Sequence, residues 1–311
     1  MFIKWSAGFF AGMLLLAAGA GSAFARDPVY IKDLRQLLQG QQEWIKVHVA
    51  EYLVWSGAAV NEVYRIFREE DRLYAAVPKY RIGIWRVLAQ ASRSKKERAR
   101  WVRKIAAVYR DTTAPDRLHA IETLSKLRYP VLPEATVNKL LREEHTSPMQ
   151  VYELWNATGF SAPGNNRAKD RLVTLLLQQL AENDHAAVPV IAYVLRFLHV
   201  LEASRWDQVR HAADLLPTDP AIHAALLTTL WIAAPAERSA EAEAAWSRLF
   251  RKRDEKEMWP YLLAGLALKG TKAGREWLLQ QYPLLSNSRL AGYNADVHAA
   301  AAYALLKMEP Y

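Results

Sequence analysis

The chain contains no cysteine among its 311 residues. Disulfide bonds, thiolate nucleophiles, cysteine-ligated zinc and iron–sulfur clusters are therefore excluded. Glycine is scarce, with 13 residues, and no segment of the chain after the first 25 residues shows the strict alternation of Val, Ile and Thr with polar residues that is typical of a half-buried strand. The hydrophobic fraction is 51%, which is enough for a large core and too high for a disordered chain. Together these features predict an all-α protein.

Familiar catalytic motifs are missing as well. The sequence has no G-x-S-x-G nucleophile elbow, no phosphate-binding P-loop and no H-E-x-x-H zinc motif. Paired carboxylates such as Glu69-Glu70 and Glu143-Glu144 are expected at helix ends, where they are solvated. We therefore expect no cofactor and no metal site. A non-enzymatic role is favoured, and catalysis stays open.

Residues 1–25 have the features of a secretory signal peptide. Lys4 provides the positive charge, Ala7 to Ala20 form the apolar region, and Ala23-Phe24-Ala25 is an A-x-A cleavage site that leaves Arg26 as the mature start. The apolar run is short compared with the roughly 20 residues of a membrane span, so cleavage is favoured over retention as an anchor. The sequence predicts a periplasmic or secreted protein that meets the membrane only transiently during export.

The formal net charge is +9, of which Lys4 contributes one. The positive residues are spread along the chain, with no single dominant tail. An exported basic protein favours anionic surfaces or polyanionic sugars as partners. We therefore expect no nucleic-acid partner.

Residues 26–311 contain a recurring helix start. Val47-His48-Val49-Ala50-Glu51-Tyr52-Leu53 aligns with Leu118-His119-Ala120-Ile121-Glu122-Thr123-Leu124. Similar triplets follow along the chain, and their middle residues are 48, 83, 119, 152, 189, 223, 260 and 298. The steps between these positions range from about 33 to 38 residues, a period that is typical of helical-repeat arrays.

Each period also contains an upstream helix. We expect such helices at Val29 to Gln39, Val60 to Glu70, Ala99 to Arg110 and Ala168 to Glu182. The first carries an apolar stripe that one hairpin cannot bury, whereas hairpins stacked side by side can. Its residues are Ile31, Leu34, Leu37 and Leu38. Prolines support the register: Asp219-Pro220 and Ser147-Pro148 are expected to cap helices, whereas Pro189 and Pro260 suggest a later helix start.

The pattern resembles the HEAT and armadillo-like families, whose second helix commonly begins Asp-x-x-Val-Arg-x-x-Ala-x-x-Ala-Leu. The segments from Asp219 to Leu226 and from Asp296 to Ala301 match most of it, with histidine where arginine is usual. The resemblance implies a right-handed α-solenoid of about eight HEAT-like helix hairpins over residues 26–311, with a possible sub-boundary near residues 161–167. Such folds mostly serve binding, here of a protein or peptide partner on a concave surface.

Chemistry-bearing residues gather in the first three repeats. His48 and Glu51 share a helix face, as do His119 and Glu122, and Arg86 occupies the position equivalent to the two glutamates. Stacking would align an acid–base–acid ladder, and Gly83 would leave a gap between the histidines. The candidate ligand-binding residues are His48, Glu51, Tyr52, Arg81, Trp85, Arg86, His119 and Glu122.

This cluster has two interpretations: a polar pocket with aromatic walls, or a structural ladder that joins neighbouring repeats. A metal site is disfavoured, because the two histidines lie two repeats apart, roughly 16–20 Å between helix axes. The leading functional prediction is a binding or scaffold protein. The alternative is a carbohydrate-associated protein, either a sugar binder or a glycan-active enzyme with its pocket in repeats 1–3. An α-toroid glycosidase would also be all-helical and tryptophan-rich, and its repeats would close into a ring.

Overall fold

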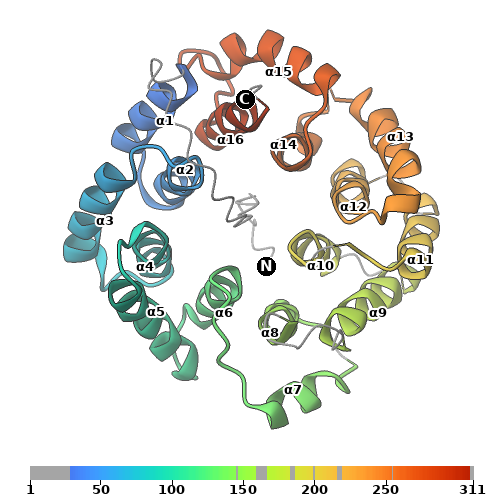
Figure 1. Cartoon of the computed structure of the whole chain (residues 1–311), viewed down its shortest axis with the longest axis horizontal. Helices are drawn as coiled ribbons and strands as arrows, with labels where there is room; N and C mark the ends of the chain where they lie inside the picture. The colour runs from blue at the N-terminus through green and yellow to red at the C-terminus, as the bar shows by residue number, and fades with distance from the viewer. Residues whose placement is uncertain are drawn as a thin grey trace.

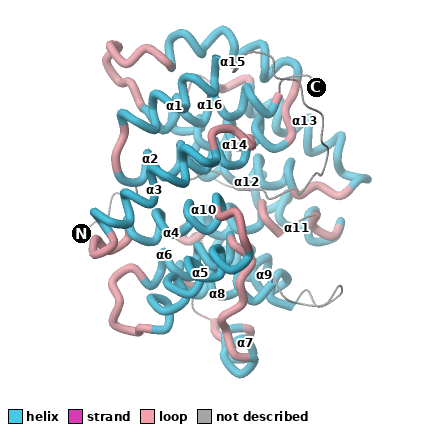
Figure 2. The backbone as a smooth tube through the Cα atoms, turned by 60° about the vertical axis from the view of Figure 1, so that its left-hand side comes forward, coloured by secondary structure: helices cyan, strands magenta, loops and turns pink. Residues whose placement is uncertain are grey.

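The computed structural model describes residues 29–144, 146–158, 167–182, 186–198, 200–215, 219–253 and 255–308. The predicted leader and most of the predicted sub-boundary near 161–167 lie outside these residues. Within them the protein is all-α, and Figure 2 shows helices and loops with no strand. This confirms the prediction of an all-α protein.

The helices alternate along the chain between an outer and an inner layer, as Figure 1 shows down the shortest axis of the molecule. The outer layer consists of α1 (Val29–Gly40), α3 (Val60–Tyr74), α5 (Lys95–Arg110), α7 (Glu134–Leu140), α9 (Arg167–Ala181), α11 (Ala203–Asp214), α13 (Ser239–Phe250) and α15 (Lys272–Leu285). The inner layer consists of α2 (Glu43–Trp55), α4 (Tyr80–Ala91), α6 (Arg117–Lys126), α8 (Pro148–Thr158), α10 (Val188–Leu195), α12 (Pro220–Ile232), α14 (Trp259–Leu268) and α16 (Ala295–Lys307).

The sequence repeat and the layers coincide. All eight triplet centres fall in inner helices, and the four upstream helices expected from the apolar stripes are α1, α3, α5 and α9. The inner helices are buried around nearly their whole circumference, since they pack on outer helices on one side and face the interior on the other. That is why the sequences of α10, α12 and α14 are largely apolar, while outer helices such as α3 are amphipathic.

Helix starts follow the expected capping chemistry in part. The Asp219 side chain accepts hydrogen bonds from the backbone N–H groups of Ala221 and Ile222, with Pro220 in the first turn of α12. Pro189 and Pro260 occupy the first turns of α10 and α14. The expected later start is confirmed, because α10 and α14 begin one residue before their triplet centres, whereas the other inner helices begin two to five residues before theirs. A proline in the first turn lacks only an N–H that the helix would not use.

The array of helices closes on itself. Each inner helix contacts the next inner helix, and α16 contacts both α2 and α1, so Figure 1 shows a ring. The Tyr30 ring on α1 meets Tyr282 of α15 edge-on, with ring centroids 5.0 Å apart. The Tyr282 hydroxyl donates to Asp33 of α1 at 2.7 Å. Because α1 packs against both α2 and α16, the last helices of the chain contribute to the burial of this helix.

Closure corrects one part of the sequence interpretation. An open solenoid leaves its first and last helices exposed on one side and offers an extended concave groove. Here the two ends cover each other, so the inner helices surround the middle of a ring. The sequence pattern describes neighbouring repeats only, and it holds no information on whether the turn per repeat brings the ends together.

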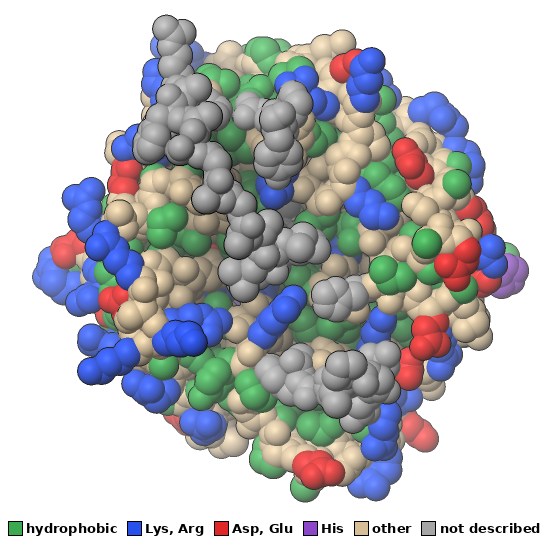
Figure 3. Space-filling view, viewed as in Figure 1, with side chains coloured by type: hydrophobic (Ala, Val, Ile, Leu, Met, Phe, Trp, Pro, Cys, Tyr) green, Lys and Arg blue, Asp and Glu red, His purple; other side chains and the backbone are tan. Residues whose placement is uncertain are grey.

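The outer surface carries charges of both signs. Figure 3 shows many Lys and Arg side chains around the rim, including the side formed by α3 and α5, interspersed with acidic side chains. In the part of the chain that the structure describes, no helix is both long and apolar enough to cross a membrane.

Candidate functional site

Two of the three predicted ladder residues form a buried ion pair. The Arg86 guanidinium on α4 donates through Nη2 to Glu51 Oε2 on α2 at 2.7 Å. Both side chains are only 2% exposed. The Gln90 amide, one turn further along α4, donates to the other Glu51 oxygen at 3.1 Å. The Glu51 carboxylate is therefore held by two groups of the neighbouring inner helix, which is what a buried charge requires.

The third ladder residue has a different main partner. Glu122 on α6 pairs with Lys126, four residues later on the same helix, at 2.9 Å. The Tyr193 hydroxyl on α10 also donates to Glu122, at 3.3 Å. Burial alone would raise the pKa of Glu122, but the positive charges of Lys126 and Arg86 outweigh it and lower this pKa to about 2. Arg86 therefore interacts with Glu122 through its charge, whereas its side-chain hydrogen bond goes to Glu51.

The space beside Gly83 is filled. A Cβ atom at this position would lie 2.8 Å from Cγ2 of Val47 and 3.2 Å from Cζ3 of Trp44. The predicted gap between the two histidines is therefore wrong. Trp44 occupies the region instead: its ring stacks on His119 with centroids 5.5 Å apart. The Arg86 guanidinium lies 5.7 Å from the Trp44 ring centroid, so one tryptophan links α2, α4 and α6.

The two candidate histidines have different surroundings. His48 Nδ1 lies 2.9 Å from Asp296 Oδ1 on α16, so it takes part in ring closure. His119 Nδ1 is buried and has no hydrogen-bond partner. Burial lowers the pKa of His119 more strongly than nearby Glu122 raises it, which favours the neutral imidazole.

Arg81 and Trp85 belong to a separate cluster on the outer side of α4. Arg81 forms two hydrogen bonds to the buried carboxylate of Asp116, of 2.7 and 3.0 Å. The Trp85 indole donates to Asp71 of α3 at 2.6 Å. These contacts join α4 to its neighbours, and no contact connects Arg81 or Trp85 to Glu51 or Glu122. The structure therefore does not bring these two candidates to the same site as the others.

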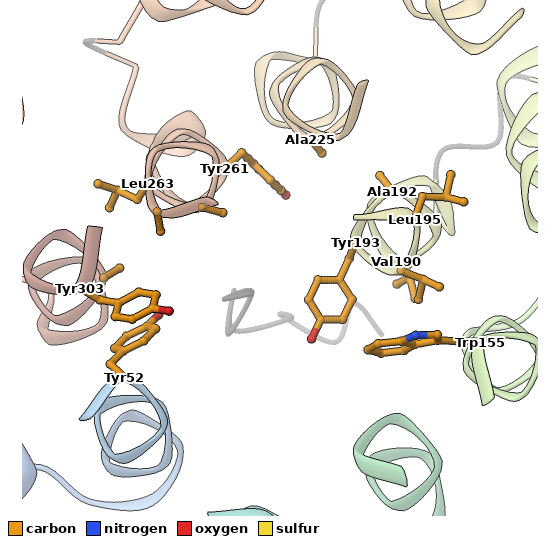
Figure 4. Close-up of a cluster of buried hydrophobic side chains, with 14 of the residues drawn as sticks. Tyr52, Trp155, Val190, Ala192, Tyr193, Leu195, Ala225, Tyr261, Leu263 and Tyr303 are labelled. Atoms are coloured by element: carbon orange, nitrogen blue, oxygen red, sulfur yellow. The ribbon is translucent and has the colours of Figure 1, made fainter. Parts of the chain in front are cut away.

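Aromatic side chains from five inner helices point towards the middle of the ring. Figure 4 shows Tyr52 and Tyr303 stacked on each other, with ring centroids 4.7 Å apart. Tyr193 and Tyr261 extend into the same central region, and Trp155 lies beside Tyr193, with centroids 5.8 Å apart. All five are buried. Of this group only Tyr52 was among the candidates from the sequence.

Several residues of this interior were missed by sequence reasoning. Lys126 lies four residues after Glu122, so the helical spacing could have identified it. Tyr193 is separated from Glu122 by 71 positions and Asp296 from His48 by 248. No local pattern predicts those pairs, because they depend on the arrangement of the ring.

The site combines aromatic walls with a small number of fixed charges. Glu51 pairs with Arg86 and Glu122 pairs with Lys126, and Tyr193 lies beside the second pair. A catalytic acid would need a carboxyl group whose pKa is raised towards neutrality, whereas that of Glu122 is lowered to about 2. Among the described residues, no three His, Asp or Glu side chains are grouped so that they could hold a metal ion.

Comparison with known proteins gives no relative for this arrangement. No family model, no curated protein and no solved structure matches the chain. The resemblance to HEAT and armadillo-like repeats stays a prediction.

Proposed function

We propose that the protein is a binding protein that holds a carbohydrate inside its helical ring. The observation that carries this proposal is that five aromatic side chains point towards the middle of the ring (Figure 4). Among them, Tyr193 contacts the Glu122–Lys126 ion pair. Small-molecule sites typically have mostly apolar and aromatic walls with a few well-placed polar groups. Aromatic faces suit the apolar faces of sugar rings, and fixed carboxylates and cations suit their hydroxyl groups.

The buried state of these side chains favours a compact ligand over a protein partner. A stable protein interface buries about 800 Å² on each partner. The inward-pointing aromatic residues are less than a tenth exposed, so they do not present an area of that size. A protein or peptide partner, the leading expectation from the sequence, would have to use other surfaces of the ring.

We further propose that the chain is a right-handed array of about eight HEAT-like helix hairpins whose ends have joined. The location is proposed to be periplasmic or secreted, after cleavage of a signal peptide behind Ala25. N-terminal sequencing of exported protein is expected to begin at Arg26, and material that retains Lys4 in the membrane fraction would contradict cleavage.

Binding is tested by isothermal titration calorimetry of the 311-residue chain against a panel of neutral and acidic oligosaccharides. Two conservative variants form a matched pair, since both remove a buried indole. Trp155 on α8 faces the middle of the ring, whereas Trp277 on the outer helix α15 packs against Phe250 of α13 and Trp259, the first residue of α14. Trp155→Phe is expected to weaken sugar binding about tenfold, a loss of about 1.4 kcal/mol, and Trp277→Phe to leave it unchanged.

The same panel separates the alternatives. Release of reducing ends during incubation would indicate a glycan-active enzyme. Binding of unrelated peptides without any binding of sugars would contradict the proposal and favour the protein or peptide partner. An equal loss of sugar affinity in both tryptophan variants would show that the sugar does not bind beside Trp155.

A further inference from the structure

Arg196 is a buried cation without a counter-ion among the described residues. It directly follows α10 as its C-terminal cap residue, and it is 5% exposed. Its Nη2 atom is buried and has no hydrogen-bond partner. Among the described residues, its Nε atom donates a long hydrogen bond of 3.4 Å to the carbonyl of Ala192 in the preceding turn. No described Asp or Glu side chain lies within ion-pair distance of Arg196.

Aromatic rings take the place that a carboxylate would normally occupy. The Arg196 guanidinium carbon lies 5.8 Å from the ring centroid of Tyr193 on α10 and 5.7 Å from that of Tyr261 on α14. Both tyrosines point towards the middle of the ring (Figure 4). Cation–π contacts position the guanidinium, but they supply no acceptor for its N–H groups.

The other buried cations of the interior are neutralised. Arg86 pairs with Glu51, and Lys126 pairs with Glu122. A buried charge without a partner is costly, and such groups in native proteins call for an explanation. Burial lowers the pKa of Arg196 to about 10, so the group remains a cation at neutral pH. A bound anion would therefore stabilise it.

We propose that Arg196, between Tyr193 and Tyr261, binds the oxyanion of an acidic sugar inside the ring. This inference rests on the proposed carbohydrate function and narrows it to sugars that carry a carboxylate or a sulfate. The guanidinium donates to the oxyanion through Nη2, and the tyrosine rings flank the sugar ring. Tyr193 joins this position to the Glu122–Lys126 pair, because its hydroxyl donates to Glu122.

The inference is tested with Arg196→Met, which keeps a long side chain and removes the charge. Arg103→Met, an exposed position on α5, is the matched control for the loss of one positive charge. The ligands are uronic-acid oligosaccharides, their neutral counterparts, sulfated oligosaccharides and inorganic phosphate, all at constant ionic strength. We expect the wild-type protein to bind an acidic oligosaccharide more tightly than its neutral counterpart by about 10- to 100-fold, the range for hydrogen bonds to charged groups.

Arg196→Met is expected to abolish this preference while neutral sugars bind as before, and Arg103→Met to retain it. Because the substitution removes an uncompensated buried charge that destabilises the fold, the thermal midpoint of Arg196→Met is expected to stay equal or to rise.

A preference for acidic over neutral sugars that survives in Arg196→Met would overturn the inference, as would a large loss of thermal stability without any change in binding. Thermal stabilisation by phosphate to the same extent as by acidic sugars would show a general anion site and would contradict the proposal of an acidic sugar as the ligand. Equal binding of neutral and acidic sugars would support the carbohydrate function and contradict the role of Arg196. Binding of no sugar would contradict both the carbohydrate function and the role of Arg196.

Discussion

The His48 imidazole lies 2.9 Å from the Asp296 carboxylate, although 248 positions separate the two residues in the chain. The contact joins α2 to α16 and thus the first inner helix to the last. Beside it, Tyr52 of α2 stacks on Tyr303 of α16. A polar contact and an aromatic contact therefore hold the two ends of the array together at the interior surface.

Ring closure predicts a short distance between the first and last helices in solution. Because the chain has no cysteine, the exposed residues Lys32 on α1 and Lys307 on α16 can be replaced in Lys32→Cys/Lys307→Cys without competing thiols. Spin labels on these two sites are expected to give one narrow, short distance distribution by pulsed electron paramagnetic resonance, since α1 and α16 are in contact. Packed helix axes lie about 8–10 Å apart. A long, broad distribution would indicate an open array.

Loss of Arg86 is predicted to destabilise the protein strongly. Arg86→Ala leaves Glu51 as a buried carboxylate that, among the described residues, keeps its hydrogen bond from Gln90. We expect a loss of about 3–5 kcal/mol in the free energy of unfolding. Arg72→Ala, which breaks the exposed Arg72–Glu69 pair, is the control and is expected to leave stability unchanged. Urea denaturation measures both. The double variant Glu51→Gln/Arg86→Met is expected to recover much of the loss, and no recovery would argue against an ion-pair origin.

Gly83 is predicted to tolerate no larger residue. In Gly83→Ala the new methyl group meets Val47 and Trp44 at 2.8 and 3.2 Å, and overpacking of this kind costs about 1–3 kcal/mol. The gain in helix propensity, about 1 kcal/mol, does not fully offset it. Gly40→Ala is the control, because nothing lies within 4 Å of a Cβ there, and it is expected to be neutral or slightly stabilising. Thermal melts of the two variants check this, and a stabilised Gly83→Ala would show that Trp44 moves aside.

The lowered pKa of Glu122 predicts that the free energy of unfolding decreases as the pH falls in the acid range. Its folded-state pKa is about 2, below the ordinary value of 4.5. A group with a lowered pKa contributes stability that is fully present above its unfolded pKa and is lost as pH falls through the folded one. At about 1.4 kcal/mol per pKa unit, the contribution is on the order of 3 kcal/mol, lost between about pH 4.5 and 2.

Glu122→Gln is therefore expected to be less stable than wild type at pH 6 and close to it near pH 2. The exposed Glu243 on α13 provides the control variant Glu243→Gln. Urea midpoints measured at several pH values decide the matter. A constant difference between Glu122→Gln and wild type at all pH values would contradict a contribution from ionisation.

The sequence predicted local features well, because they depend on residues close together in the chain. The repeat centres, the outer helices and the cap at Asp219 follow from helical spacing and from the chemistry of helix ends. The Glu51–Arg86 pair followed as well, since equivalent positions on neighbouring helices face each other. The prediction of an open gap at Gly83 was wrong because Trp44, only four residues before His48, occupies that space.

The aromatic interior and the unpartnered Arg196 could not be predicted in this way. Tyr193 and Tyr261 surround Arg196 from two inner helices that are separated by α12. Their meeting depends on the curvature of the whole array, which accumulates over many helix contacts and is not encoded in any one repeat. For the same reason, the repeat pattern led to the prediction of a solenoid with a concave surface, although the ends of the array meet.

Closure also limits how this architecture can change by duplication. An open array can gain or lose a repeat, because a new unit only extends the stack. In a ring, the rotation per unit multiplied by the number of units must equal one full turn. An added pair of helices would therefore require a smaller rotation angle at every other junction. The contact between α16 and α1 thus limits the number of repeats that the fold can contain. Growth in length is confined to the loops between helices, and cutting the chain at such a loop while linking α16 to α1 would preserve the same circle.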